Sequence, residues 1–178
     1  MKANNRFYFR EFAKSDWEAV HEYASQEIVS QYQPWGPNTI EESQAFVEEI
    51  LKDAGKKPRL RFAFAVVFKE DDKMIGAGEL AVKDIANRAG EIGYIINPAY
   101  WGKGIATEVA EALTEFGFNE KQLHRIYATC DPRNIGSQKV LGKIGMVKEG
   151  RIRDDLRMKD GWRDSLLYSL LEHEWRDR

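Results

Sequence analysis

The stretch from Glu91 to Phe118, EIGYIINPAYWGKGIATEVAEALTEFGF, most constrains what this chain can fold into. It opens with an apolar, β-branched run, Ile92–Ile96, which has the length of a buried strand. Between this run and the next segment, Gly102 and Gly104 remove two Cβ atoms where the chain bends, so backbone N–H groups can approach a ligand closely. The segment after the turn predicts an amphipathic helix, because its apolar residues recur at i, i+3, i+4 and i+7: Val109, Ala112, Leu113 and Phe116.

A strand, a glycine-rich turn and a helix start in this order make a site for a phosphate group. The first turn of a helix leaves its N–H groups unpaired and carries partial positive charge. The P-loop pattern does not fit, because Lys103 lies between the two glycines and is followed by Gly104. The dinucleotide fingerprint does not fit either, because Thr107 replaces its last glycine and residues 97–101 separate the strand from the turn. A turn that merely joins strand to helix is the structural alternative.

The third interpretation of this turn is a resemblance. The run Asn-Pro-Ala-Tyr-Trp-Gly-Lys-Gly-Ile-Ala-Thr-Glu at 97–108 resembles the acetyl-CoA pyrophosphate loop of the GNAT superfamily of N-acetyltransferases. It is most similar to the RimJ/RimL branch, which includes the N-terminal acetyltransferases of ribosomal proteins. The resemblance implies an acetyl-CoA-dependent N-acetyltransferase whose single GNAT domain spans residues 1–178. Its specific motifs lie between Glu91 and Met146.

Length and composition fit a small soluble enzyme. A chain of 178 residues is expected to form one domain that buries roughly 70% of its unfolded surface. The formal net charge of −2 provides no basic excess for binding nucleic acid. The single cysteine, Cys130, cannot form an internal disulfide, which suits a reducing cytoplasm, and its apolar setting predicts a packed strand residue. We expect no signal peptide and no membrane span, because no sufficiently long apolar run occurs.

Local patterns predict the element order β-α-α-β-β-β-α-β-α-β-β. Capping boxes at Ser15–Glu18 and Thr39–Glu42 predict two helix starts. Alternation from Leu60 to Phe68, followed by the run Met74–Val82, predicts a hairpin. Further strands are expected at about 6–12, 124–130, 147–153 and 164–171, with a polar loop at 154–163 and a short helix at 135–144.

Early hairpins and later crossover helices predict an α/β (α+β) fold with one mixed, mostly antiparallel sheet and about four helices. This order agrees with the GNAT fold that the resemblance implies. In that fold the end of the central strand splays from its neighbour at a bulge. Pro98 supports an interruption there, because proline breaks a strand ladder.

The resemblance also implies how acetyl-CoA is held. Backbone groups of Ile95, Ile96 and Asn97 would contact the pantetheine arm. The superfamily motif Q/R-x-x-G-x-G/A begins at Trp101 here, which removes one polar contact but is familiar in the RimJ/RimL branch. The pyrophosphate would rest on backbone N–H groups of the loop residues Gly102, Lys103, Gly104, Ile105, Ala106 and Thr107.

A second motif, DPRNIGS at 131–137, resembles the family's D-x-x-N-x-x-S. Asn134 can cap the helix that follows, and the resemblance adds a hydrogen bond from Asn134 to the pantetheine. Ser137, one turn on, would point its hydroxyl at the CoA sulfur. Lys139 and Lys143 share a helix face and could meet the CoA phosphates, although solvated lysines are equally common.

Many GNAT enzymes carry a proton-donating tyrosine in this helix, but its place falls on Leu141 here. Either Ser137 or a water therefore takes the role, or no acid is needed, because a thiol of pKa about 8.5 leaves fairly well unaided. Glu91, at the start of the central strand, is the first candidate for the base, and Glu79 on the neighbouring strand is the second. A solvated strand-end carboxylate is the structural alternative for both. A backbone N–H at the splay would polarise the carbonyl, and no metal is expected.

The acceptor is predicted to be a primary amine, foremost a protein or peptide α-amine such as a ribosomal protein N-terminus. At pH 7 roughly 10% of an α-amine is free base, against about 0.04% of a lysine amine. Tyr32, Trp35 and Trp162 are predicted to line the acceptor channel, and basic residues near Trp162 could steer an acidic acceptor. A small-molecule amine (polyamine, amino acid or aminoglycoside) and a non-catalytic acyl-CoA-binding module are the alternatives. The family also allows a homodimer.

Overall fold

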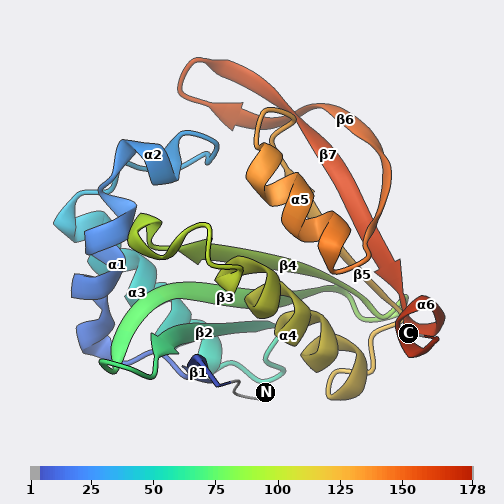
Figure 1. The fold of residues 1–178 in the computed structure, drawn as a ribbon, viewed down its shortest axis with the longest axis horizontal. Helices are drawn as coiled ribbons and strands as arrows, with labels where there is room; N and C mark the ends of the chain where they lie inside the picture. The colour runs from blue at the N-terminus through green and yellow to red at the C-terminus, as the bar shows by residue number, and fades with distance from the viewer. Residues whose placement is uncertain (1–4, 178) are drawn as a thin grey trace.

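The computed structural model describes residues 5–177 and builds them around one seven-stranded sheet of order β1-β2-β3-β4-β5-β7-β6 (Figure 1). All neighbouring strands pair antiparallel except β4 and β5, which are parallel. The mixed, mostly antiparallel sheet predicted from the sequence is thereby confirmed. The strands are β1 (Phe7–Arg10), β2 (Arg61–Phe68), β3 (Lys73–Asp84), β4 (Ala89–Ile96), β5 (Arg125–Cys130), β6 (Val147–Met158) and β7 (Gly161–Leu171).

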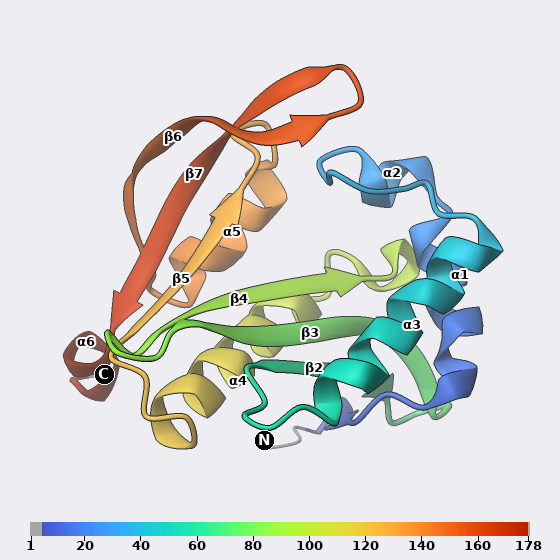
Figure 2. The same cartoon turned by 180° about the vertical axis from the view of Figure 1, so that it is seen from behind.

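Helices cover both faces of the sheet (Figures 1 and 2). Helices α1 (Trp17–Ala24) and α3 (Ile40–Ala54) pack on one face, and α4 (Ile105–Asn119) packs on the other, next to α5 (Ile135–Lys143). Two short helices, α2 (Glu27–Ser30) and α6 (Glu172–Arg176), bring the α-helices of the described residues to six. The expected number was about four, because segments of four or five residues are too short to show a helical period. No helix in residues 5–177 is long and apolar enough to cross a membrane.

The strand β2 shows why both faces of the sheet are apolar. Phe64 and Val66 belong to the cluster under α4, whereas Ala65 and Val67 belong to the cluster under α1 and α3. Successive side chains of a strand point to opposite faces, so a strand covered on both sides needs apolar residues at every position. The sheet is therefore held from both sides, and Leu113 of α4 is completely buried against it.

The pairing of β4 with β5 is short. It comprises three residue pairs and ends at Glu91 with Tyr127. Beyond this point β4 follows β3 as far as Ile96, whereas β5 follows β7, so the two strands diverge into a V (Figure 2). The predicted splay of the central strand is confirmed. The register shift in the β3–β4 ladder, however, lies between Val82 and Asp84, and the ladder runs unshifted through the end of β4.

The polar loop predicted at 154–163 is wrong. Strands β6 and β7 continue as a hairpin arm in which Arg157 pairs with Trp162 and Met158 pairs with Gly161. A register shift between Ile152 and Leu156 absorbs the extra residues. This arm lies beyond the helices that cover the sheet (Figure 1), so its strands carry charged residues and lack the apolar alternation that predicts a strand.

One of the two predicted capping boxes is confirmed. At the start of α3, Thr39 Oγ1 accepts a hydrogen bond from the Glu42 N–H at 3.2 Å, and Glu42 Oε2 accepts one from the Thr39 N–H at 2.8 Å. The box predicted to start at Ser15 is wrong. The carboxylate of Asp16 instead accepts from the Ala13 N–H at 2.7 Å, and a 3-10 turn precedes α1.

A polar contact ties the last three strands of the sheet together. Glu149 of β6 accepts hydrogen bonds from the Arg125 guanidinium of β5, at 2.5 and 2.6 Å, and from Ser169 Oγ of β7 at 2.6 Å. The bonds from Arg125 and Ser169 lower the pKa of Glu149 to about 2. The contact therefore holds the edge strand to the sheet while Glu149 is ionised.

The lowered pKa of Glu149 makes a prediction about stability and pH. A carboxyl group whose pKa is lower in the folded state stabilises the fold above its ordinary value, 4.5, and loses that contribution as the pH falls toward about 2. We expect Glu149→Gln to lower the free energy of unfolding at pH 7, measured by urea denaturation, and the deficit to shrink between pH 4.5 and pH 2. Glu48→Gln, which changes an exposed carboxylate of α3, is the control. A deficit that does not change with pH would contradict the prediction.

Candidate active site

A cavity of about 1290 Å³ lies where β4 and β5 diverge. The glycine loop before α4 and the start of α5 form one end of it, and the loop at 31–38 with α3 forms the other. Residues from distant parts of the chain thus meet where β4 and β5 diverge. The site lies here because the parallel pairing ends early, at Glu91 with Tyr127, and the ends of the two central strands then separate.

The glycine loop has the backbone conformation that its sequence requires. Gly102 has φ +74° and Gly104 has φ +79°, both in the left-handed region that favours glycine. A Cβ at Gly102 would meet no atom within 4 Å, so backbone conformation rather than lack of space calls for this glycine. Gly104 is the N-cap of α4, and Ile105, 1% exposed, anchors the first turn in the core. Except for Lys103, the predicted loop residues from Gly102 to Thr107 line the cavity.

Trp101 and Lys103, which were also predicted to contact the cofactor, make hydrogen bonds that stabilise the glycine loop. Trp101 Nε1 donates to the backbone oxygen of Ile96 at 2.6 Å, so the indole fixes the loop to the end of β4. Lys103 folds back: its Nζ lies 3.3 Å from the Ala99 oxygen and 5.1 Å from the centre of the Tyr100 ring. The tryptophan therefore performs a structural task that the family motif does not describe, and the lysine side chain lies outside the cavity lining.

Asn97, also predicted to contact pantetheine, lies outside the cavity lining. Its Oδ1 accepts from the Ala99 N–H at 3.1 Å, and its Nδ2 donates to Glu22 Oε1 at 3.0 Å. The side chain thus caps the turn that leaves β4 and joins it to α1. Ile95 and Ile96 do line the cavity, as predicted for backbone contacts along the strand end.

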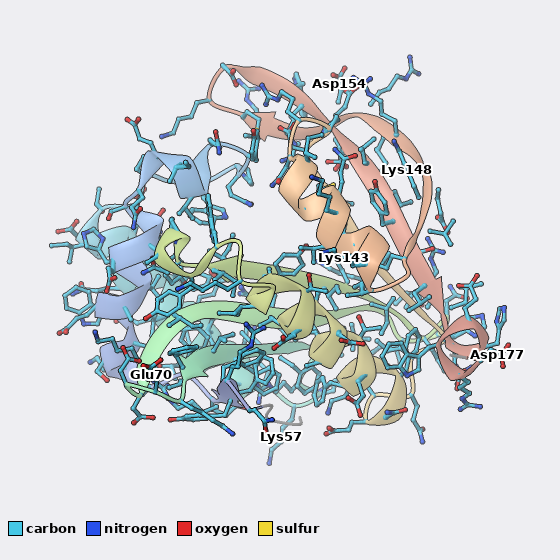
Figure 3. All side chains as sticks on the ribbon, viewed as in Figure 1. Lys57, Glu70, Lys143, Lys148, Asp154 and Asp177 are labelled. Atoms are coloured by element: carbon cyan, nitrogen blue, oxygen red, sulfur yellow. The ribbon has the colours of Figure 1, made fainter. Side chains whose placement is uncertain are left out.

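The start of α5 brings the second motif to the cavity. Asn134 Oδ1 accepts from the Ser137 N–H at 2.9 Å, which confirms the predicted cap and leaves the amide nitrogen of Asn134 for another partner. The Ser137 hydroxyl lies 3.3 Å from the Tyr94 hydroxyl. Leu141, one turn further along α5, is completely buried. Lys139 and Lys143 line the cavity and are exposed, and Lys143 lies at the end of α5 (Figure 3).

The structure separates the two candidate bases. Glu79 lines the cavity, and its Oε2 accepts from Arg61 Nε at 3.0 Å and Nη2 at 2.8 Å. It lies beside Gly93, where an added Cβ would be 3.9 Å from Glu79 Oε1, so the missing side chain leaves room next to this oxygen. Glu91 lies outside the cavity lining, and its carboxylate pairs with Lys83 at 3.1 Å. Geometry therefore favours Glu79, the second candidate from the sequence, over Glu91.

The end of the cavity formed by the loop at 31–38 and α3 is called the acceptor end. It differs from the sequence expectation at one aromatic residue. Tyr32 and Trp35 line the cavity as predicted, but Trp162 does not: it is 60% exposed, and its ring centre lies 6.0 Å from the Arg157 guanidinium on the hairpin arm. The next residue, Arg163, lines the cavity instead. Neighbouring residues of a strand face opposite sides, so the strand that replaces the predicted loop exchanges the roles of Trp162 and Arg163.

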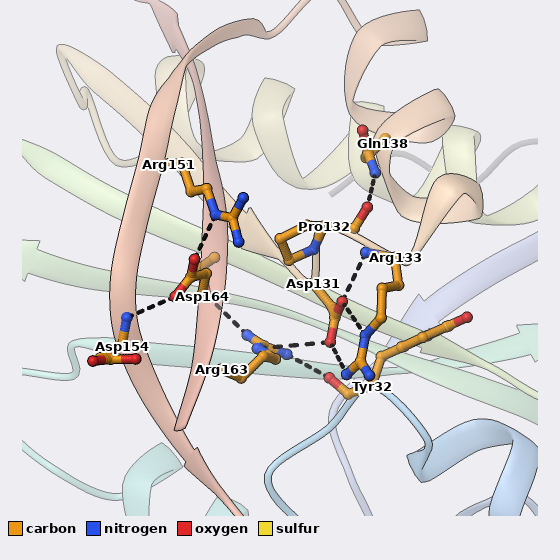
Figure 4. Close-up of polar contacts among 10 residues, drawn as sticks. Tyr32, Asp131, Pro132, Arg133, Gln138, Arg151, Asp154, Arg163 and Asp164 are labelled. Carbon is orange, nitrogen blue, oxygen red and sulfur yellow. Dashed lines mark hydrogen bonds and ion pairs between the residues drawn. The ribbon is translucent and has the colours of Figure 1, made fainter. Parts of the chain in front are cut away.

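Arg163 connects the hairpin arm to the loop at 31–38 (Figure 4). It is 8% exposed, donates to the Tyr32 backbone oxygen at 2.5 Å and lies 4.0 Å from the carboxylate of Asp131. Burial opposes ionisation of Asp131, but bonds from Arg133 hold the pKa of this carboxyl below its usual range. Lys159 adds a second bond, to the Gly36 oxygen at 2.7 Å. Side chains of the hairpin arm thus hold the loop at 31–38 by its backbone oxygens.

The residues present fit acetyl-CoA as the substrate that this cavity receives. Two left-handed glycines and the N-terminus of α4 can accept the diphosphate, because a helix start presents backbone N–H groups and partial positive charge. Of the loop N–H groups, that of Thr107 also donates to the Gly104 oxygen at 3.1 Å. Lys139 and Lys143 supply cations at the same end. The diverging strands leave a path for an extended arm toward Ser137. At the other end, Glu79 can receive a proton from an amine.

Comparison with known proteins agrees with this geometry. The family model for the acetyltransferase (GNAT) domain matches residues 6–147. The chain is similar to the uncharacterized N-acetyltransferase YnaD of Bacillus subtilis, with 41% identity over 170 residues and 96% of each chain covered. It is also similar to the spermidine N(1)-acetyltransferase of Escherichia coli, with 26% identity and coverage of 93% of this chain and 86% of that protein.

Solved structures show the same architecture. A GNAT-family acetyltransferase from Bacillus anthracis has a TM-score of 0.84 and 36% identity, with 97% of this chain and 98% of that chain covered. The ribosomal-protein-S5-alanine acetyltransferase from Vibrio fischeri has a TM-score of 0.81 and 29% identity, with 98% and 97% covered. The family model spans most of the sequence, and the loop, splay and cavity agree with it. The chain therefore belongs to the GNAT family of acetyltransferases and is an acetyl-CoA-dependent N-acetyltransferase.

Proposed function

We propose that this enzyme acetylates a primary amine of low pKa, foremost the α-amine of a protein or peptide. The observation that carries the proposal is the position of Glu79, whose carboxylate lies in the cavity beside the side-chain-free position of Gly93. Carboxylates are weak bases, so they serve best an acceptor that is already partly neutral, and α-amines meet this condition better than lysines. The similarity to the ribosomal-protein-S5-alanine acetyltransferase supports the same class of acceptor.

In the proposed mechanism, each cavity residue has one task. Backbone N–H groups from Gly102 to Thr107 hold the diphosphate, and Lys139 and Lys143 compensate phosphate charge. Glu79 receives the proton that the acceptor nitrogen loses as its bond to the acetyl carbon forms. Ser137 donates a hydrogen bond to the sulfur that leaves when the carbon–sulfur bond breaks, and water then supplies the proton of the free thiol. Glu91 is the alternative base and would act through water.

The stabilisation of negative charge on the carbonyl oxygen is assigned to β4. Beyond Glu91, the backbone groups of β4 on the β5 side have no partner strand, because β5 turns away. A backbone N–H in this position can donate to an oxygen as charge develops on it. The open side of β4 between Glu91 and Ile96 therefore combines a place for the extended pantetheine arm with the electrostatic part of catalysis.

A small-molecule amine is the second candidate acceptor, and the charge of the cavity favours it. Glu42, Glu49 and Glu79 line the acceptor end together with Arg61. Arg61 pairs with Glu79 at 2.8 Å and with Glu49 at 3.1 Å. With Lys159, Arg163 and Asp131, which also line this end, four carboxylates face three cations there. This surplus would attract a second amino group of a polyamine. The similarity to a spermidine N(1)-acetyltransferase supports the same candidate.

The proposed setting of the enzyme is the cytoplasm, and the proposed branch is that of the RimJ/RimL type. The only cysteine of the sequence, Cys130, is buried and unpaired, as is usual for chains kept in a reducing compartment. A ribosomal protein N-terminus would be available there as an acceptor. A homodimer agrees with the proposal, but no step of the proposed mechanism depends on a second subunit.

The glycine loop makes a prediction about binding. Gly104 adopts φ +79°, so Gly104→Val must either strain or rebuild the N-cap of α4. We expect acetyl-CoA binding, measured by calorimetry, to be abolished while the protein stays folded by circular dichroism. Gly150→Val is the control, because Gly150 is not at a positive φ and an added Cβ there meets no atom within 4 Å. Unchanged binding by Gly104→Val would remove the loop from the site.

Ser137 makes a prediction about turnover. If its hydroxyl stabilises the leaving sulfur chiefly in the transition state, Ser137→Ala should lower kcat about 10-fold or more, or about 1.4 kcal/mol, with a smaller effect on acetyl-CoA binding. Ser137→Thr keeps the hydroxyl and should retain most of kcat. A kcat of Ser137→Ala within about twofold of the wild type would leave the role to water.

The acceptor can be tested by competition. We expect acetylation of a peptide with a free α-amine and blocked lysines to exceed that of the same peptide with a blocked N-terminus and a free lysine, and that of spermidine. The reason is the larger neutral fraction of an α-amine at pH 7. Mass spectrometry would locate the acetyl group. Acetylation confined to spermidine would favour the second candidate, and acetylation confined to lysine would refute both acceptor assignments.

A further inference from the structure

The cavity contains a hydrogen bond that spans its two sides. Tyr94 stands on β4, three positions beyond the last residue that pairs with β5, and Ser137 stands in the first turn of α5. The two hydroxyl oxygens are 3.3 Å apart, and both residues line the cavity. The bond therefore joins the β4 side of the V to the helix that follows β5, at the place assigned to the leaving sulfur.

The surroundings decide which hydroxyl donates. Burial raises the pKa of Tyr94, so the phenol keeps its proton through neutral and mildly alkaline pH. Ser137 is held in place by its backbone N–H bond to Asn134 Oδ1 at 2.9 Å. The thiol of Cys130 also adjoins Ser137, but burial raises its pKa, and a thiol is a weak donor and a weak acceptor. The Tyr94 phenol is thus the stronger partner of the serine hydroxyl.

At the next turn of α5, the residue facing the core offers no polar group that could orient the Ser137 hydroxyl in place of Tyr94. Leu141, one turn after Ser137, is completely buried and apolar. A serine hydroxyl alone can rotate among several partners, which weakens any single bond that it makes. If the hydroxyl accepts a bond from the half-buried phenol of Tyr94, its own proton has to point elsewhere. Successive hydrogen bonds also polarise one another, so the serine becomes a better donor.

We propose that Tyr94 is a positioning residue that donates to Ser137 Oγ and thereby directs the serine proton at the thioester sulfur. This inference rests on the proposed function, in which Ser137 stabilises the leaving sulfur. No proton is transferred along the pair: both hydroxyls keep their protons, the sulfur leaves as a thiolate, and water supplies its proton. The phenol thus acts on the serine from β4, across the cavity from α5.

A double-mutant cycle tests the pair by turnover. Tyr94→Phe should lower kcat about 3- to 10-fold and leave KM for acetyl-CoA within about twofold. In the Ser137→Ala background the same change should alter kcat by less than about twofold, because the hydroxyl that it orients is gone. Tyr8→Phe is the matched control, because it removes a phenol bonded to Asp72 at 2.6 Å on β1, outside the cavity lining. Equal losses in both backgrounds would overturn the proposal.

A second measurement needs no turnover. CoA alone serves as the probe, and the ultraviolet absorbance of its thiolate is followed against pH in the complex, with desulfo-CoA complexes as the blank for Cys130. The pair should lower the pKa of the bound thiol, and Tyr94→Phe and Ser137→Ala should each raise it by about half a pH unit or more. An unchanged thiol pKa in Tyr94→Phe would overturn the proposal. Absence of acetyl transfer by the wild type would instead refute the proposed function, while the titration would still test the pair.

Discussion

The three-residue parallel pairing between β4 and β5 is the constraint on which the rest of the structure depends. It is long enough to join the two halves of the sheet, and it stops early enough to leave the ends of both strands apart. Backbone groups buried without a partner are costly, so an unpaired strand side in the middle of a sheet needs a ligand or water to satisfy it. The cavity, the glycine loop and the start of α5 all gather around this opening.

Apolar packing holds both sides of the opening, and polar ties add to it on the β5 side. Apolar clusters on both faces hold β2, β3 and β4, with α4 on one side and α1 and α3 on the other. The β5 side belongs to the same apolar cluster as α4, through residues such as Ile126 and Leu170, and it adds polar ties. Glu149 joins three strands, and Arg163 and Lys159 connect the hairpin arm to the loop at 31–38. Both of the latter bonds end on backbone oxygens, so the wall of the acceptor end is positioned independently of the side chains that it presents.

Several features of the site could be predicted because they depend on neighbouring residues. The left-handed glycines, the Asn134 cap and the Thr39 capping box follow from local stereochemistry and from hydrogen bonds over three residues. The strand, turn and helix at 91–118 have the same local origin, and they were sufficient to identify the family. The structural roles of Trp101 and Lys103 were not predicted, because they depend on how each side chain folds back. Trp101 lines the cavity and also donates to the Ile96 oxygen, whereas Lys103 turns to the Ala99 oxygen and lies outside the cavity lining.

The sequence by itself determined the order of the strands and longer helices, the glycine turn between β4 and α4, and the kind of chemistry, whereas the short helices α2 and α6 were not predicted. Tertiary structure alone decided which side chains meet. It placed Glu79 rather than Glu91, and Arg163 rather than Trp162, in the cavity lining. It also brought Tyr94 to Ser137 across 43 positions of the chain, and Arg163 to Tyr32 across 131. The physical reason is that the direction of a strand side chain depends on the register of pairing and on where two strands separate. Both are set by packing between segments that are distant in the chain.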